Sequence, residues 1–352
     1  MEDQKIYINE EPTQMPIVET AADTVKAARK TVSRVGFRLF FGLLITYVVV
    51  YAVSFIVLKF KPEWSEDPTM SLLVSVVPQY LFGMTAMIAL VWPLPHKAPE
   101  KKSVTFGFCF RSFVITYSLM MAANFIGTMI AATISLATGT GSTTYAVQTF
   151  ILEANQWVVI LVAVIIGPIV EEFIFRKLIV DRVGKYGEAV SALVSGVLFG
   201  LFHGNLIQGL YAFVIGYFFA LIYSKTGKIY VTMGIHIAIN FMGSVIAPQL
   251  LKLLDLNKLI EVYKSGDASA ILSFAEQNAT GILVLMVYEF VVYGLLIAGI
   301  ILCIVNRRTY FPSKGEIQLP KKSAFKVAVL NPGVLCVVGL MVVMMVINFV
   351  AG

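Results

Sequence analysis

Long apolar stretches separated by short polar loops fill the sequence from residue 37 to its end. A helix needs about 20 mostly apolar residues to cross the hydrocarbon core of a bilayer. Nine stretches come close to this requirement: 37–58, 71–94, 112–137, 157–177, 189–206, 207–224, 229–250, 281–305 and 330–351. The pattern therefore predicts an all-α fold, a polytopic transmembrane helical bundle with about eight to nine spans.

The segments before and between the spans are polar. Residues 1–36 mix both charges and predict a cytosolic polar tail, followed by a single membrane domain over 37–352 without an internal repeat. In 145–156 and 251–277, polar or charged residues interrupt the apolar positions, which predicts interfacial rather than spanning segments. The basic, proline-containing segment 307–326 is typical of a cytosolic linker.

Composition and charge agree with a membrane protein. Of the 352 residues, 58% are hydrophobic and 14% are charged, whereas about a quarter are charged in a soluble domain. Most of the 27 Lys and Arg residues fall in alternate loops. The other loops hold only Lys59, Lys61, Lys252, Lys258 and Lys264. By the positive-inside rule this distribution predicts a cytosolic N-terminus in a multi-pass protein of the cell membrane. No nucleic-acid-binding motif accompanies the net charge of +6.

A few polar side chains fall inside the predicted spans or at their edges. Charged groups at such positions are costly and by default mark functional sites. The set contains Glu171, Glu172, Arg176, His203, His236, Asn240 and Glu289, together with the neutral Asn124 and Gln208. Every aspartate lies in a loop or tail, and the chain has neither an HExxH zinc motif nor a GxSG-like serine motif. These absences argue against the aspartyl, HExxH and serine types of protease.

The spacing of these residues indicates which of them act together. Residues four apart lie on one face of a helix, so Glu172 and Arg176 can pair while Glu171 points elsewhere and stays available for chemistry. His236 and Asn240 also project together from one span. A carboxylate in a low-dielectric site can act as a general base, and an imidazole can help to position a water. An amide NH₂ can stabilise an oxyanion. These groups together suit hydrolysis of an amide by an activated water.

Several of these residues also have purely structural interpretations. Glu172 and Arg176 can form an ion pair that only stabilises helix packing. His203 can be an ordinary histidine of the membrane interface. Glu289, which the motifs described below do not explain, can line a substrate path or accept a hydrogen bond from a tyrosine, and we expect it to be a packed, protonated carboxyl group.

The depth of His203 in the membrane depends on where the fourth span ends. His203 follows Lys185 by 18 residues, about 27 Å along a straight helix, which would place it far from Glu171. The two side chains reach a common depth if the fifth span begins deep in the membrane, or if the fourth span continues to about Arg182. We expect the second arrangement.

Three short motifs occur in a fixed order on three predicted spans. EEFIFR (171–176) fits EExxxR, FGLFH (199–203) fits FxxxH, and HIAIN (236–240) fits HxxxN. Each motif is weak alone, but the ordered set is specific. Over about 157–245 the sequence resembles the CAAX prenyl protease and bacteriocin-processing family (CPBP, or Abi) of intramembrane proteases.

The resemblance implies a role for each residue of the first two motifs. Glu171 would be the base that activates water, and Glu172 would be its companion, held by Arg176. His203 would assist the same water or ligate a metal.

The third motif would complete the site. By the same resemblance, His236 and Asn240 would stabilise the oxyanion. Zinc is the cofactor that the resemblance suggests, with Glu171, His203 and His236 as candidate ligands. A metal-free glutamate mechanism stays open beside it.

The sequence therefore predicts an intramembrane endopeptidase that cleaves a peptide or a lipidated protein in the membrane. A prenylated CAAX-like protein, a bacteriocin and a peptide pheromone are all admissible substrates. Two alternatives are a proton-coupled transporter, with protons relayed through Glu171, Glu172, His236 and Glu289, and a non-catalytic membrane scaffold. No motif position is replaced, which favours a catalytic site. The sequence leaves the oligomeric state open.

Overall fold

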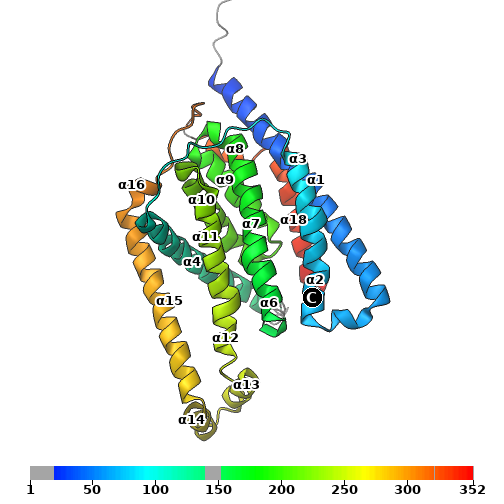
Figure 1. Ribbon diagram of the computed structural model, residues 1–352, viewed down its shortest axis with the longest axis vertical. Helices are drawn as coiled ribbons and strands as arrows, with labels where there is room; N and C mark the ends of the chain where they lie inside the picture. Colours follow the sequence, from blue (N-terminus) through cyan, green and yellow to red (C-terminus); the bar gives the residue numbers. More distant parts are fainter. Residues whose placement is uncertain (1–19, 139–151, 321, 352) are drawn as a thin grey trace, which may run out of the picture.

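The computed structural model describes residues 20–138, 152–320 and 322–351, which form helices and connecting loops without a strand (Figure 1). This confirms the all-α helical bundle. Most of the predicted interfacial segment 145–156 lies outside the described residues. The other such segment, 251–277, connects the seventh and eighth predicted spans. It forms two short helices at the lower end of Figure 1, α13 (Leu256–Ser265) and α14 (Ala268–Gln277).

In the rest of the described chain, four π-helical segments each join two consecutive helices. The helices are α1 (Ala21–Phe60), α2 (Pro68–Pro78), α3 (Thr85–Val91), α4 (Phe106–Thr138), α6 (Gln156–Val159), α7 (Gly167–Glu172), α8 (Ile179–Val183), α9 (Glu188–Phe202), α10 (Leu206–Thr226), α11 (Ile229–Phe241), α12 (Ala247–Leu251), α15 (Ala279–Val305), α16 (Arg307–Tyr310), α17 (Ala324–Ala328) and α18 (Pro332–Ala351). The π-helical segments are Gln79–Met84, Ile160–Ile166, Phe173–Leu178 and Met242–Ile246. Such wide turns often occur at functional sites.

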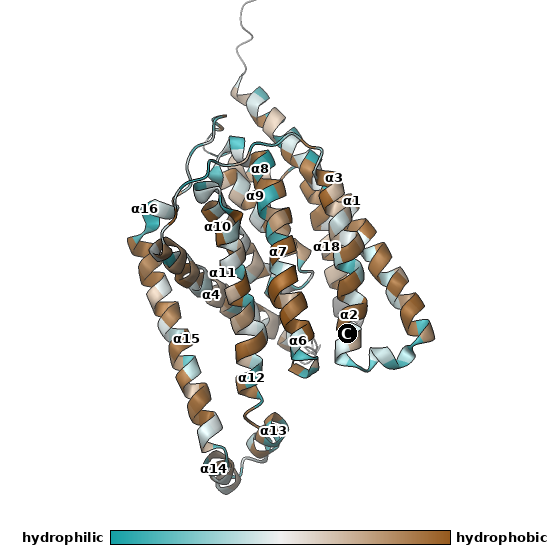
Figure 2. Ribbon diagram, viewed as in Figure 1, coloured by the Kyte–Doolittle hydropathy of each residue, from teal (hydrophilic) through white to brown (hydrophobic). Residues whose placement is uncertain are grey.

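Seven helices in the described part of the chain are long and apolar enough to cross a membrane. They are Ala21–Phe60, Pro68–Val91, Phe106–Ala137, Gln156–Tyr186, Ile207–Thr226, Ile229–Leu251 and Ala279–Val305. Glu188–Phe202 and Pro332–Ile347 are shorter apolar helices. Hydrophobic residues fill the middle of the bundle and polar residues its two ends (Figure 2). The chain is a multi-pass membrane protein.

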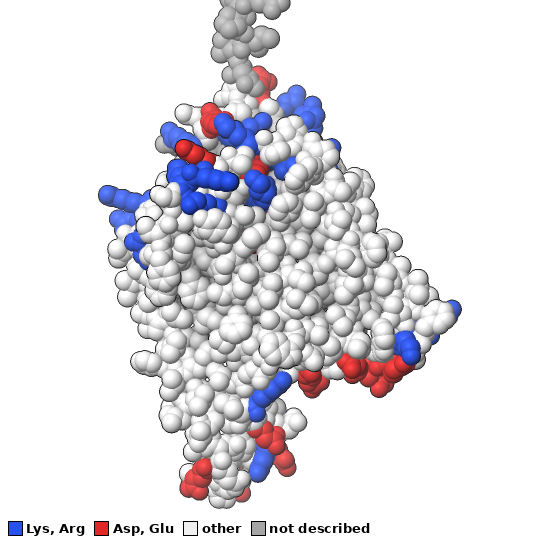
Figure 3. Space-filling model, in the orientation of Figure 1, with Lys and Arg blue, Asp and Glu red and all other residues white. Residues whose placement is uncertain are grey.

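The charged side chains lie at the two ends of the bundle. In Figure 3, Lys and Arg gather at the end where α1 begins, Asp and Glu predominate at the opposite end, and a broad uncharged belt separates them. Side chains that must stay in water sit at the membrane surfaces, whereas the belt faces lipid. The cytosolic placement of the N-terminus stays a prediction.

The first helix begins earlier than the apolar pattern indicates. Residues 21–36 belong to the predicted polar tail, yet α1 starts at Ala21, after a capping box made by Thr20 and Asp23. Its first turns bury Ala28 and Val32. Arg29 also donates to the backbone carbonyl of Leu330, just before α18. This part of the helix is polar on one face only, which explains why its sequence does not resemble a span.

The fourth span is one long helix from Gln156 to Tyr186, in which α6, α7 and α8 follow one another through π-helical segments. It therefore continues past Arg182, as expected from the depth argument. The next helix, α9, has only 15 residues and is about 22 Å long, shorter than the hydrocarbon core of about 30 Å. His203 is its C-terminal cap. Because α9 starts at the charged end of the bundle, it ends inside the membrane and places His203 there.

Glycines allow α9 and α10 to pack closely. A Cβ atom on Gly200 would lie 2.6 Å from the carbonyl oxygen of Gly209, and one on Gly196 would lie 2.9 Å from that of Phe213. A Cβ atom on Gly216 would lie 3.0 Å from the side chain of Phe199. Small residues at such a crossing let helix backbones approach each other in a membrane. The close packing fixes the helix end that carries His203.

Candidate active site

The three motifs converge on one cavity of about 560 Å³ within the bundle. Glu171 reaches it from α7, His203 from the end of α9, and His236 and Asn240 from α11. Segments more than 60 residues apart thus share one site. Glu172 and Arg176 do not line the cavity but lie behind it, with fully buried side chains.

The ion pair predicted from the EExxxR motif is present. Arg176 Nη2 lies 2.8 Å from Glu172 Oε1, and both side chains are 0% exposed. The guanidinium also sits over two aromatic rings, 4.6 Å from the centroid of Phe199 and 5.3 Å from that of Phe219. Cation–π contacts of this kind strengthen when water is excluded. Glu172 is therefore held as a carboxylate in a fixed position.

One imidazole lies between the two glutamates. His236 Nδ1 is 3.1 Å from Glu172 Oε1, and His236 Nε2 is 3.8 Å from Glu171 Oε2. Because Glu172 is paired with a guanidinium, its carboxylate can only accept hydrogen bonds. Nδ1 of His236 therefore carries a proton and is the donor of this hydrogen bond. Glu171 is thus not as isolated as the sequence indicated, since His236 joins it to the supporting pair.

His203 is oriented by its own helix. Its Nδ1 lies 2.9 Å from the carbonyl oxygen of Phe199. A carbonyl accepts, so Nδ1 donates, and the lone pair of a neutral ring then lies on Nε2. The ring also stands edge-on to Phe199 at a centroid distance of 4.8 Å. Phe199, the first residue of the FxxxH motif, therefore fixes both the position and the tautomer of His203.

Glu171 and His203 line the same cavity without touching each other. Among the described residues, the histidine nitrogen that comes within 4.0 Å of the Glu171 carboxylate is that of His236. Both side chains are therefore accessible to a small molecule, such as water, that occupies the cavity. A water there could hydrogen-bond to both side chains, which is the arrangement that a general base requires.

Asn240 has a structural partner that sequence reasoning missed. Its Nδ2 donates to the carbonyl oxygen of Ala163 at 2.8 Å. Pro168 has no N–H, and the N–H of Gly167 bonds to Val162 instead, so the Ala163 carbonyl lacks a donor within its own helix. In a membrane such a freed carbonyl must find a partner on a neighbouring helix. Pro168, three residues before Glu171, was the available signal in the sequence.

Replacing Asn240 by Leu is expected to lower the stability of the protein by about 1–3 kcal/mol, because the Ala163 carbonyl loses its donor. Adding Pro168→Ala should restore much of this loss, since an alanine supplies an N–H at that position. Unfolding temperatures of the detergent-solubilised variants measure both effects. Equal stability of the single and double variants would contradict this account.

The donor groups of the site match a metal centre in their tautomers but not in their positions. Ligating histidines usually donate their other N–H to a carboxylate or a backbone carbonyl, as His236 and His203 do. However, no three His, Cys, Asp or Glu side chains in the described residues converge closely enough to hold an ion. The predicted zinc ligands Glu171, His203 and His236 thus share the cavity without forming a coordination site.

Residues 153–242 match the family model for "Type II CAAX prenyl endopeptidase Rce1-like" proteins. We name this matched segment the Rce1-like domain, after the family that it is similar to. A curated relative from Bacillus subtilis (strain 168), "Putative membrane peptidase YdiL", is 38% identical over 82 residues, which are 23% of this chain and 34% of the relative. The chain thus spans about a third of the length of the curated relative that it matches. No solved structure matches it.

The Rce1-like domain forms only part of the cavity wall. All seven motif residues lie within the domain, as do Gln208 and Tyr211. Helices outside the domain complete the wall. They contribute Tyr80 from the first of the four π-helical segments, Tyr117 and Asn124 from α4, and Tyr288 and Glu289 from α15. Of these polar residues, the sequence had singled out Asn124, Gln208 and Glu289, and for Glu289 alone it had offered a place on a substrate path.

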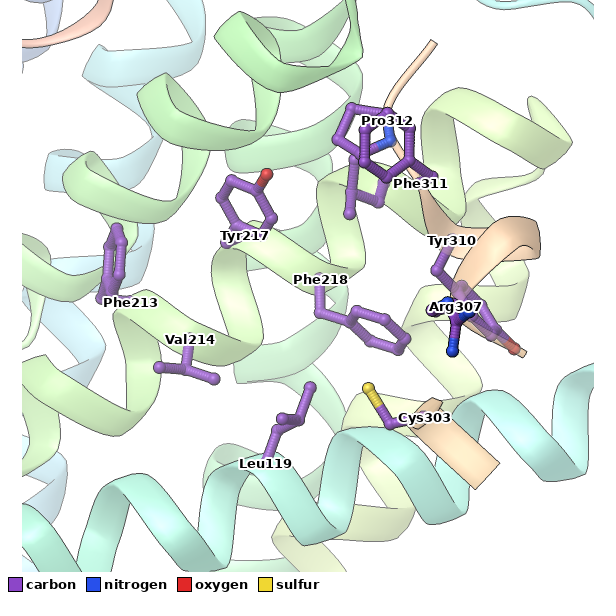
Figure 4. A pocket seen from close by; sticks show the side chains of 11 residues that line it. Leu119, Phe213, Val214, Tyr217, Phe218, Cys303, Arg307, Tyr310, Phe311 and Pro312 are labelled. Carbon is purple, nitrogen blue, oxygen red and sulfur yellow. The ribbon is translucent and has the colours of Figure 1, made fainter. Parts of the chain in front are cut away.

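A second cavity, of about 380 Å³, lies between α4, α10, α15 and α16 (Figure 4). Apolar and aromatic side chains such as Leu119 and Phe218 form most of its wall, and Arg307 and Tyr310 stand at one side. The wall contains no carboxylate and no histidine among the described residues. It therefore lacks the carboxylate and imidazole groups that activate a water, and the cavity that the three motifs line is the candidate active site.

Proposed function

We propose that the protein is an intramembrane endopeptidase that hydrolyses a peptide bond with a water activated by Glu171. The observation that carries this proposal is the convergence of Glu171, His203 and His236 on one cavity inside a membrane-embedded bundle. The match of residues 153–242 to an endopeptidase family supports the same reaction class. We place the catalytic core at about 157–245, within a single membrane domain.

In the proposed mechanism, a water lies between the carboxylate of Glu171 and Nε2 of His203. Glu171 accepts a proton from this water while the water oxygen attacks the carbonyl carbon of the peptide bond. His203 accepts a hydrogen bond from the second water proton and so directs the attack. Glu171 then passes its proton to the leaving nitrogen as the C–N bond breaks, which yields a carboxylic acid and an amine; the acid then loses its remaining proton to the amine or to solvent.

The oxyanion that forms during the attack needs hydrogen-bond donors. One N–H of the Asn240 amide donates to the carbonyl oxygen of Ala163, and the other is available to a group in the cavity. Preorganised donors of this kind can supply several kcal/mol of transition-state stabilisation.

We propose a membrane-associated peptide or a lipidated protein as the substrate, because the cavity lies within the apolar belt of the bundle. The description of the matching family points to prenylated CAAX proteins. Bacteriocin precursors and peptide pheromones fit the same requirement for a membrane-associated chain.

The proposal predicts that the purified protein in liposomes cleaves hydrophobic peptides without forming an acyl-enzyme. Incubation in H₂¹⁸O should place one ¹⁸O atom in the new carboxylate, as mass spectrometry can show. Added hydroxylamine should give no hydroxamate, because water rather than a side chain attacks the peptide. A hydroxamate product would contradict the activated-water mechanism. Peptide-driven proton flux without any cleavage would instead support a transporter.

A further inference from the structure

Glu289 is a carboxylate in the membrane that the proposed mechanism does not use. It lies ten residues after Ala279, the start of α15, or about 15 Å along the helix axis. This distance places it well inside the hydrocarbon layer, where a charged group is costly and usually functional. Among the described residues, no Lys, Arg or His lies within ion-pairing distance of Glu289.

Glu289 lines the cavity that also holds Glu171, His203 and His236. It approaches the cavity from α15, outside the Rce1-like domain, whereas the histidines and Glu171 come from within the domain. Tyr117 and Tyr288 lie beside Glu289 on the same wall. The position of Glu289 thus allows contact with a substrate that reaches the motif residues.

The charges of the cavity favour a cationic ligand. Two carboxylates, Glu171 and Glu289, line the cavity, and no Lys or Arg lines it among the described residues. Arg176, which lies behind the site, is already paired with Glu172. A low-dielectric cavity lined by one sign of charge attracts the opposite charge strongly.

We propose that Glu289 is a specificity-determining residue that binds the cationic side chain of a Lys or Arg in the substrate, near the peptide bond to be cleaved. This inference rests on the proposed function, and it names the class of substrate that the same cavity accepts. The substrate cation supplies the charge partner that α15 lacks, which accounts for a carboxylate at this depth. A packed, protonated carboxyl group would give no such charge preference.

The test uses hydrophobic peptides that differ at a single position, which carries Lys, Arg, Gln or Glu and is moved along the peptide. For the wild-type protein in liposomes we expect kcat/KM to be at least about tenfold higher with Lys or Arg than with Gln at one position. Glu289→Gln should lose this preference, so that its kcat/KM values for the Lys, Arg and Gln peptides become similar. Glu289→Lys should favour the Glu peptide instead.

Glu276→Gln, on the exposed surface of α14, is the matched control and should keep the wild-type preference. The inference is overturned if Glu289→Gln retains the preference for Lys and Arg, or if it slows all peptides equally, as a merely structural change would.

A binding measurement separates this inference from the proposed function. In a Glu171→Gln background, the Kd of the Lys peptide should be lower than that of the Gln peptide, and adding Glu289→Gln should abolish the difference. Selective binding without cleavage by the wild-type protein would uphold the role of Glu289 and reject the peptidase. Cleavage without charge selectivity in either assay would uphold the peptidase and reject the role of Glu289.

Discussion

Replacing Glu171 by Gln is expected to lower kcat/KM for peptide cleavage by about 10²–10⁴-fold, the usual contribution of a general base. Gln keeps the size and shape of the side chain but cannot accept a proton from water. The variant should therefore fold normally, because Glu172 and not Glu171 forms the buried ion pair with Arg176. Rates from purified variants in liposomes, together with unfolding temperatures, measure the two expectations separately.

Glu261→Gln provides a control of the same chemistry. Glu261 lies exposed on α13, away from the cavity, so its loss should change neither the rate nor the stability. If Glu171→Gln cleaved peptides at a rate close to the wild type, Glu171 would not be the base. A large fall in unfolding temperature would show instead that Glu171 is needed for folding.

Replacing Arg176 by Met should destabilise the protein by about 3–5 kcal/mol, because it leaves the carboxylate of Glu172 buried without its main partner. The stability of Arg176→Lys should lie between that of Arg176→Met and that of the wild type. Lysine keeps the charge but loses the planar contacts with Phe199 and Phe219. Unfolding temperatures of the three proteins in the same detergent provide the measurement.

The double variant Glu172→Gln/Arg176→Met identifies the cause of this loss. Removing both charges should cost less than removing Arg176 alone, since no unpaired carboxylate remains. If the double variant were less stable than Arg176→Met, packing of the arginine rather than its charge would explain the effect. Wild-type stability of Arg176→Met would rule out a supporting role for the ion pair.

The features that the sequence predicted are those that depend on local spacing or on segment length. Apolar length alone indicated the spans, because a bilayer imposes a minimum length on every helix that crosses it. The pairing of Glu172 with Arg176 follows from one turn of helix. An extension of the fourth span to about Arg182 followed from the requirement that His203 and Glu171 share a depth, and the helix runs slightly further, to Tyr186.

The features that were missed depend on contacts between helices. Nothing in the spacing of the motifs shows that His236 lies between two glutamates, because α7 and α11 meet only through tertiary packing. The bond from Asn240 to Ala163 likewise needs two helices side by side. The placement of Glu289 at the site also belongs to this class, since α15 follows the Rce1-like domain in the chain and joins it only in space.

The short α9 helix makes the supply of water a requirement of the proposed reaction. Hydrolysis consumes one water per peptide bond, yet this water must reach His203 at a depth where lipid normally excludes it. Gly200 is buried and residues 201–205 are at most partly exposed, so this end of α9 is surrounded by protein rather than by lipid. Water must therefore come to His203 through the cavity that this side chain lines. The proposed reaction would thus depend on the protein's own interior to carry water across part of the bilayer.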